Sequence, residues 1–243
     1  MTRRLLLISN STNAGEEYLG WPRQLISDFM KDTGVKRLLF LPWAGVNLAD
    51  GLEASWDVYE QRVNGVFNLL GLEVYSIHKE KDPIKAVENA EAMAVGGGNT
   101  FHLVYMMHKT GILDAVKKRI GEGMHFMGWS AGANVACPTM CTTNDMPIIE
   151  PASFTCLNLV PFQINPHYLD AHAQGHGGET REQRINEFLD INREITVVGL
   201  REATALWVEN NHIALKGSRP LRLFGHGKEP VEYQPGEDIN FLL

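Results

Sequence analysis

Short apolar runs alternate with amphipathic stretches through the first half of this chain of 243 residues, and this alternation limits the folds open to it. The apolar runs are typical of buried strands and cover Leu5–Ser9, Arg37–Pro42, Leu72–His78, Ala92–Val95 and His125–Gly128. The stretches between them have helical periodicity and cover Trp21–Lys31, Ser55–Leu70, Pro83–Asn89 and Thr100–Lys118. Buried strands that alternate with helices predict an α/β fold, a mostly parallel sheet with helices on both faces.

The second half is less regular, but further strands are expected at 194–200, 204–209 and 212–217. The sequence contains no internal repeat, low-complexity tract or obvious linker, so we expect one domain over residues 1–243. A chain of this length buries a sizeable hydrophobic core without help from disulfides or metals.

Composition and charge exclude several classes of function. The formal net charge is -7 and no dense basic face is evident, which argues against a nucleic-acid partner. The three cysteines form no C-x-x-C pair and indicate free thiols in a reducing compartment. The first apolar run is too short for a secretory signal, and no segment is long enough to span a bilayer. We therefore expect a soluble cytoplasmic protein with no membrane partner.

A serine between two glycines marks the first candidate for chemistry. Residues 128–134 read GWSAGAN and match G-x-S-x-G, in which the serine lies on a tight strand-to-helix turn whose small neighbours leave its hydroxyl exposed. A second glycine-bearing turn, VGGGNT at 95–100, lacks the spacing and the lysine of a phosphate-binding loop. In a parallel sheet both turns fall at the carboxyl ends of strands, where ligands bind. Ser130 is thus a candidate nucleophile, and the N–H groups of Ala131 and of Gly97 or Gly98 are candidate oxyanion donors.

A nucleophilic serine needs a base, and the base needs an orienting acid. His167 follows Pro166 at a loop position from which a side chain can be aimed. His172 and His176 stand four residues apart, but the glycines around them disfavour a helix and no glutamate lies between them. We therefore expect a flexible loop over the site, no metal and no cofactor.

The residues alone do not identify the orienting acid, since Asp145, Glu150, Asp170 and Glu202 are all candidates. An α/β-hydrolase order would instead select an acid such as Asp190 and a late histidine, His212 or His226.

Several strings, taken in order, resemble one family. They are LLLISNST, LPWAGV, VGGGNTFHL, GWSAGANVACPT, TTNDMPI, QINPHY and GETREQRI, and they extend from the first strand to about Glu202. Together they resemble peptidase E, the aspartyl dipeptidase family. The fold of that family is similar to class I glutamine amidotransferases, of flavodoxin-like type, and to cyanophycinase.

The resemblance implies a Ser-His-Glu triad in which Ser130 is the nucleophile, His167 the base and Glu202 the acid. The family often has Leu-Pro-Glu-Gly around the glutamate, whereas this chain has Leu-Arg-Glu-Ala at 200–203. Asp145 matches a functionally implicated family position. We assign it to site support or to the substrate's α-amino group, with the orienting acid as the alternative.

The resemblance also implies a small acidic dipeptide as substrate, one with an N-terminal aspartate. A guanidinium is the side chain best suited to bind its β-carboxylate. Arg181 and Arg184 could instead lie on a solvated helix face with Glu182 and Glu187 as partners. The resemblance favours Arg181 as the ligand of the carboxylate. Asn99 is assigned to substrate binding as well.

Two rival functions are an α/β-hydrolase-type esterase and a non-enzymatic small-molecule-binding domain. Monomer and homodimer are both compatible with the sequence.

Overall fold

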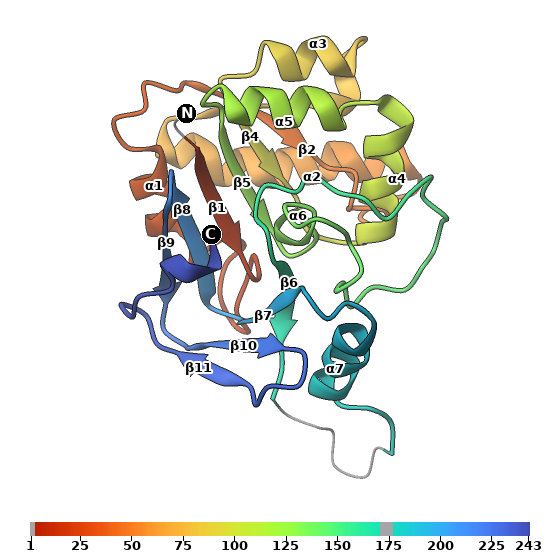
Figure 1. The fold of residues 1–243 in the computed structure, drawn as a ribbon. Coiled ribbons are helices and arrows are strands. Elements are labelled where there is room, and N and C mark those ends of the chain that lie inside the picture. The colour runs from red at the N-terminus through yellow and green to blue at the C-terminus, as the bar shows by residue number, and fades with distance from the viewer. Residues whose placement is uncertain (1–2, 171–176) are drawn as a thin grey trace.

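The computed structural model describes residues 3–170 and 177–243. Its main feature is a seven-stranded sheet of order β3-β2-β4-β5-β1-β8-β9 (Figure 1). The parallel strands are β1 (Arg4–Ile8), β2 (Arg37–Leu41), β3 (Glu73–Ser76), β4 (Ala92–Val95) and β5 (His125–Trp129). The antiparallel strands β8 (Thr204–Glu209) and β9 (His212–Gly217) extend the sheet beyond β1. The predicted mostly parallel α/β fold is confirmed.

Helices cover both faces of this sheet (Figure 1). One face carries α1 (Arg23–Met30) and α2 (Leu52–Phe67), and the other carries α3 (Pro83–Glu88), α4 (Thr100–Thr110), α5 (Leu113–Gly121) and the single-turn α6 (Ala131–Asn134). Short 3-10 turns occur at η1 (Asn68–Leu70), η2 (Ile77–Lys79) and η3 (Asn240–Leu242).

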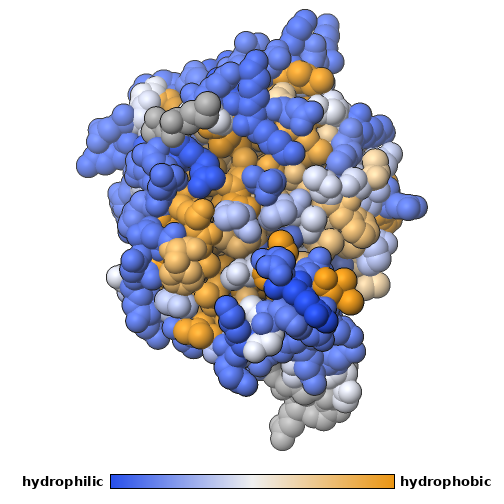
Figure 2. All heavy atoms as spheres, viewed as in Figure 1, coloured by the Kyte–Doolittle hydropathy of each residue, from blue (hydrophilic) through white to orange (hydrophobic). Residues whose placement is uncertain are grey.

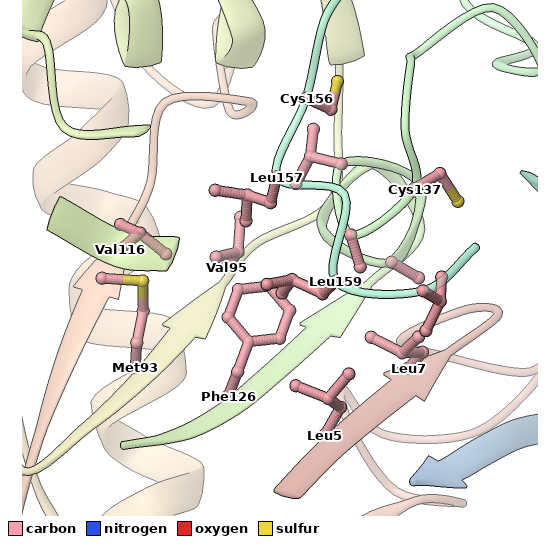
Figure 3. Close-up of a cluster of buried hydrophobic side chains, with 14 of the residues drawn as sticks. Leu5, Leu7, Met93, Val95, Val116, Phe126, Cys137, Cys156, Leu157 and Leu159 are labelled. Carbon is pink, nitrogen blue, oxygen red and sulfur yellow. The ribbon is translucent and has the colours of Figure 1, made fainter. Parts of the chain in front are cut away.

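Each face of the sheet has its own hydrophobic cluster, because successive side chains of a strand point to opposite faces. Leu5 and Leu7 of β1 point to one face and pack with Phe126 of β5 beneath Leu157 and Leu159 (Figure 3). Leu6 and Ile8 point to the other face and pack with residues of α1 and α2. The inner parallel strands β1, β2, β4 and β5 are thus largely buried on both sides, as continuous apolar runs predict, whereas the edge strand β3 has Glu73 exposed.

A second, smaller sheet of order β11-β10-β7-β6 lies beyond the carboxyl end of β1 (Figure 1). It consists of β6 (Gln163–Tyr168), β7 (Thr196–Arg201), β10 (Leu221–Gly225) and β11 (Val231–Tyr233), with α7 (Arg181–Ile191) packed against it. Only β6 and β7 pair in parallel. The sequence did not predict this separate sheet.

Most predicted elements differ from the structure by one to three residues at their ends, and two differ for an identifiable physical reason. The helix expected over Thr100–Lys118 is divided into α4 and α5, because Gly111 adopts a left-handed conformation (φ 70°) that caps α4. The strand expected over Leu72–His78 ends at Ser76, where a 3-10 turn begins.

Hydrophilic residues form most of the rim of the face in Figure 2, and hydrophobic residues lie nearer its centre. Within residues 3–170 and 177–243, no helix is long and apolar enough to cross a membrane.

One buried arginine joins the ends of three segments around the smaller sheet. The guanidinium of Arg201, at the end of β7, donates to both carboxylate oxygens of Asp170 at 2.8 and 2.6 Å. It also donates to both carboxylate oxygens of Glu232 on β11, at 2.6 and 2.9 Å. These bonds hold the pKa of Asp170 and of Glu232 below the usual values for carboxyl groups.

Replacement of Arg201 by methionine should lower the free energy of unfolding by about 1–2 kcal/mol, since both carboxylates are partly exposed and screened by solvent. A depressed pKa stabilises the fold above the unfolded-state value, about pH 4, and this stability is lost as the pH falls through the folded-state pKa. Urea unfolding should therefore show a difference between wild type and Arg201→Met that is largest above about pH 5 and shrinks below about pH 4. Arg219→Met, at an exposed position, is the control; a difference independent of pH would contradict the account.

Candidate active site

Ser130 occupies a strained turn between β5 and α6. Its backbone has φ 54° and ψ -114°, a positive φ that non-glycine residues rarely adopt. The turn is held because the Ser130 N–H donates to the Ile8 carbonyl at 2.9 Å, while the Ser130 carbonyl accepts from the N–H groups of Ala133 and Asn134. Strain of this kind persists only where surrounding structure fixes it, and it is concentrated at functional sites.

The flanking glycines serve the packing of α6 more than the serine itself. A Cβ on Gly128 would lie 2.2 Å from the Gly132 carbonyl oxygen, and one on Gly132 would lie 2.1 Å from the Val95 carbonyl oxygen. The glycines therefore permit the tight turn that the sequence predicts through close contacts with the backbone of α6 and β4 rather than with the hydroxyl. Room beside Ser130 comes instead from Gly97, where a Cβ would lie 2.9 Å from the Ser130 Cβ.

Ser130, His167 and Glu202 form a continuous hydrogen-bonded chain. His167 Nε2 lies 3.0 Å from Ser130 Oγ, and His167 Nδ1 lies 2.8 Å from Glu202 Oε1. With its proton on Nδ1, the imidazole donates to the carboxylate and accepts from the hydroxyl. Ser130 comes from the seven-stranded sheet, whereas His167 lies on β6 and Glu202 follows β7 in the smaller sheet. The geometry is that of a nucleophile, a base and an orienting acid.

Two residues that the sequence reasoning did not assign to the site hold these groups in place. The fully buried Ser9 hydroxyl accepts from the His167 N–H at 2.9 Å and donates to the Leu200 carbonyl at 2.7 Å. The side-chain oxygen of Asn10 accepts from the Ala203 N–H at 2.9 Å. Their position in the sequence could have identified them, because polar residues directly after a buried parallel strand lie at the sheet edge where ligands bind.

Asp145 and Asn99 lie together at the N-terminus of α4. Asp145 Oδ2 accepts from the Thr100 N–H at 2.7 Å and from the Thr100 hydroxyl at 2.6 Å. A carboxylate is favoured at this end of a helix by the peptide dipoles. Asn99 caps α4 by accepting from the His102 N–H at 3.0 Å, and its amide donates to the Met146 carbonyl. Among the described residues, no hydrogen bond joins Asp145 to His167.

Arg181 is the first residue of α7 and enters the same site. Its guanidinium donates to the Asn144 side-chain oxygen, and Asn144 in turn donates to the Pro166 carbonyl at 2.7 Å. Burial lowers the pKa of Arg181, but a guanidinium keeps its charge in proteins. Two other charges of this helix are paired elsewhere, since Arg184 contacts Glu179 and Glu182 contacts Arg222.

A cleft of about 730 Å³ brings these groups together. Its lining contains all eight residues assigned from the sequence, namely Gly98, Asn99, Ser130, Ala131, Asp145, His167, Arg181 and Glu202. Within the described chain, the backbone N–H groups of Gly98 and Ala131 donate to no protein acceptor. They are therefore free to bind an oxygen atom of a ligand.

The rival acids and histidines lie outside this cleft. His226 Nδ1 is 3.5 Å from Asp190 Oδ1, but both line a different, smaller cavity, and His212 lies on β9. Asp170 is bound to Arg201, and Glu150 lines a third cavity. His172 and His176, with most of the loop expected over the site, lie outside the described residues.

One group of potential metal ligands is present in the described chain, and it is separate from the cleft. Asp57, Glu60 and His78 bring their ligand atoms within 4.8 Å of one another. The Lys79 ammonium already lies between the two carboxylates, 2.8 Å from Asp57 and 2.5 Å from Glu60. A cation is thus supplied by the chain itself.

Comparison with known proteins identifies the family of the chain. The model of peptidase family S51 matches residues 5–216. The chain is 49% identical to peptidase E of a Nostoc species over 243 residues, which cover 100% of this chain and 98% of the relative. It is 43% identical to peptidase E of Shigella flexneri over 232 residues, covering 96% of this chain and 98% of that one.

Among solved structures, a peptidase from an acI-B1 actinobacterium shares the fold with a TM-score of 0.72 at 17% identity, covering 98% of this chain and 97% of that one. The family model spans every residue of the Ser130 site, and the two relatives by sequence cover 100% and 96% of this chain. The chain therefore belongs to peptidase family S51.

Proposed function

We propose that this serine peptidase hydrolyses dipeptides with an N-terminal aspartate, and that Ser130, His167 and Glu202 are its catalytic triad. The observation that carries the proposal is the continuous chain from Glu202 through His167 to Ser130, with contacts of 2.8 and 3.0 Å. The family and its peptidase E relatives support a peptidase. The charged groups around Ser130 support the preference for aspartate.

In the acylation step, His167 accepts the hydroxyl proton of Ser130 as Oγ attacks the carbonyl carbon of the aspartyl residue. The N–H groups of Gly98 and Ala131 donate to the resulting oxyanion, which is the group they are free to bind. Imidazolium His167 then gives its proton to the leaving amine as the C–N bond breaks. Glu202 holds the ring orientation and stabilises the imidazolium.

In the deacylation step, a water molecule replaces the departed amine. His167 takes a proton from this water, which attacks the aspartyl ester of Ser130. The Ser130 oxygen then leaves and recovers a proton from His167, so that aspartate is released and the enzyme is restored.

Substrate recognition follows from the charges at the α4 and α7 side of the cleft. Arg181 carries a guanidinium that matches the β-carboxylate of the substrate, and Asn99 adds a neutral polar contact. Asp145 supplies the negative charge that an α-ammonium group needs. A local positive group is required because the net charge of -7 would otherwise repel an acidic dipeptide.

The remaining proposals concern the setting of the enzyme. We propose that the chain is a single domain over residues 1–243, that it acts in the cytoplasm as a monomer or homodimer, and that it binds no nucleic acid. The free thiols of Cys137, Cys141 and Cys156 support a reducing compartment.

Hydrolysis of Asp-Leu should be the defining activity, and Ser130→Ala should reduce it by more than about 10⁴-fold because the nucleophile is lost. The measurement compares Asp-Leu with Glu-Leu, Asn-Leu and acetyl-Asp-Leu, each with and without EDTA. Only Asp-Leu should be cleaved, and EDTA should have no effect. Ser153→Ala, an exposed serine outside the cleft, is the control. Full activity of Ser130→Ala, or no cleavage of any peptide by wild type, would refute the proposal.

Glu202→Gln keeps the shape of the side chain and removes its charge, so kcat for Asp-Leu should fall by about 10²–10⁴-fold with little change in KM. Asp145→Asn should act mainly on KM, since its carboxylate faces α4 rather than His167. Steady-state kinetics of both variants decide which residue orients His167. The reverse pattern would transfer that role to Asp145.

Arg181→Ala should lower kcat/KM for Asp-Leu by about 10- to 100-fold, because a charge-assisted contact to the β-carboxylate is lost. The ratio of Asp-Leu to Asn-Leu cleavage should collapse in the same variant. Arg184→Ala is a matched control on the same helix outside the cleft. An unchanged ratio in Arg181→Ala would remove Arg181 from the specificity site.

A further inference from the structure

The cleft contains a second guanidinium that the mechanism above does not use. Arg62 of α2 is exposed and lines the cleft, where it and Arg181 are the two residues of Lys or Arg type. Most other arginines in the described chain contact a carboxylate, for example Arg23 with Glu17 and Arg37 with Glu73. Within the described residues, neither Arg62 nor Arg181 has a carboxylate within 4.0 Å. Within the described part of the chain, both guanidinium groups of the cleft are thus without an ion-pair partner.

Arg62 and Arg181 reach the cleft from different parts of the fold, Arg62 from α2 and Arg181 from α7. Tyr59, one turn before Arg62 on α2, packs in the cluster that contains Leu6, Ile8 and Trp129. Asp145 binds the N-terminus of α4, whose residues pack in the opposite cluster, and Arg181 contacts the neighbouring Asn144. Ser130 lies between the two, at the end of β5. The cleft therefore extends from Ser130 in two directions, and each direction contains one guanidinium.

A chain of contacts connects Arg62 to the turn beside Ser130. The guanidinium of Arg62 lies over the Tyr18 ring, 5.6 Å from its centroid. The Tyr18 hydroxyl lies 3.4 Å from the Tyr59 hydroxyl, which donates to the Gly97 carbonyl at 2.9 Å and accepts from Trp129 Nε1 at 3.1 Å. The contact with the Tyr18 ring favours positions of the Arg62 guanidinium beside the cleft.

The tyrosines do not cancel this charge. Burial raises the pKa of Tyr18 and of Tyr59, so both phenols stay neutral at pH 7. The rest of this side of the cleft is lined by Gly45, Val46, Asn47 and Leu48, none of which is charged. The surface on this side can therefore receive an apolar side chain with an anionic group beyond it.

A dipeptide has such an anion one residue from the scissile bond. When the aspartyl residue is bound on the Arg181 side, the leaving residue extends to the other side of Ser130. One residue of extended chain spans about 3.3–3.6 Å, so its terminal carboxylate stays within the cleft. We propose that Arg62 binds the free α-carboxylate of the leaving residue, and that the cleft thereby recognises an Asp-X dipeptide from both ends.

This inference rests on the proposed aspartyl dipeptidase function and assigns its leaving-group subsite. The contact exists only until the C–N bond breaks, because the leaving residue then departs with its carboxylate. Arg62 should therefore affect kcat/KM, which covers binding and acylation, and should leave hydrolysis of the aspartyl ester unchanged.

The test compares Asp-Leu with Asp-Leu-amide, which lacks the terminal charge, in wild type and Arg62 variants. Wild type should cleave Asp-Leu about 10- to 100-fold more efficiently than the amide, the range expected for one charge-assisted contact. Arg62→Ala should lower kcat/KM for Asp-Leu to about the value for the amide, while the amide itself changes less than about twofold. Arg62→Lys should retain part of the preference, and Arg62→Glu should reverse it.

Gln61→Ala, an exposed neighbour on α2, is the matched control, and thermal unfolding checks that each variant is folded. Equal cleavage of Asp-Leu and its amide by wild type would overturn the subsite and leave the proposed function intact. An equal loss on both substrates in Arg62→Ala would also overturn it, since a structural effect does not depend on the terminal charge. If wild type cleaves neither substrate, the proposed function fails and the subsite falls with it.

Discussion

The carboxyl end of β1 holds the reacting groups in one geometry. Its Ile8 carbonyl fixes the N–H of Ser130, and the next residue, Ser9, binds the N–H of His167 and the carbonyl of Leu200. Asn10 then fixes the turn after Glu202 through the Ala203 N–H. Three consecutive residues thus connect the nucleophile on one sheet to the base and the acid on the other. Because Ser9 is fully buried, its hydroxyl has no water to replace either partner.

The parallel half of the fold follows from local sequence, and the smaller sheet does not. Strands such as β2 are buried on both faces, so they appear in the sequence as uninterrupted apolar runs. By contrast, β11 is a three-residue edge strand with two exposed positions, and β10 alternates only weakly. Their pairing depends on β7 and on the Arg201 contacts, which no local pattern reveals. The end of α4 at Gly111 was predictable in principle but was not predicted, because a glycine near the end of a helical pattern is a recognisable stop signal.

The same distinction applies to the site. Ser130 was predictable because a strand, a turn and a helix leave a short, ordered pattern, and His167 and Glu202 were assigned through family strings. Arg62, Tyr18 and Tyr59 could not be found this way, since they come from separate segments that meet only after the sheet has formed. Asp145 was only partly predictable. The family strings identified it as a site residue, but only the structure shows that its carboxylate faces Thr100. Residue types define candidates, and packing decides which of them share a cleft.

The origin of Ser130 and His167 on two different sheets has a consequence for how the enzyme fails. Displacing reacting groups by about 1 Å can cost about 100-fold in rate, whereas helices and strands remain intact over much larger movements. A displacement of the smaller sheet by about 1 Å relative to β1 would therefore reduce turnover by about 100-fold with no loss of secondary structure. Activity is therefore a more sensitive measure of the relative position of the two sheets than secondary structure is, and we expect it to be lost on heating before the fold melts.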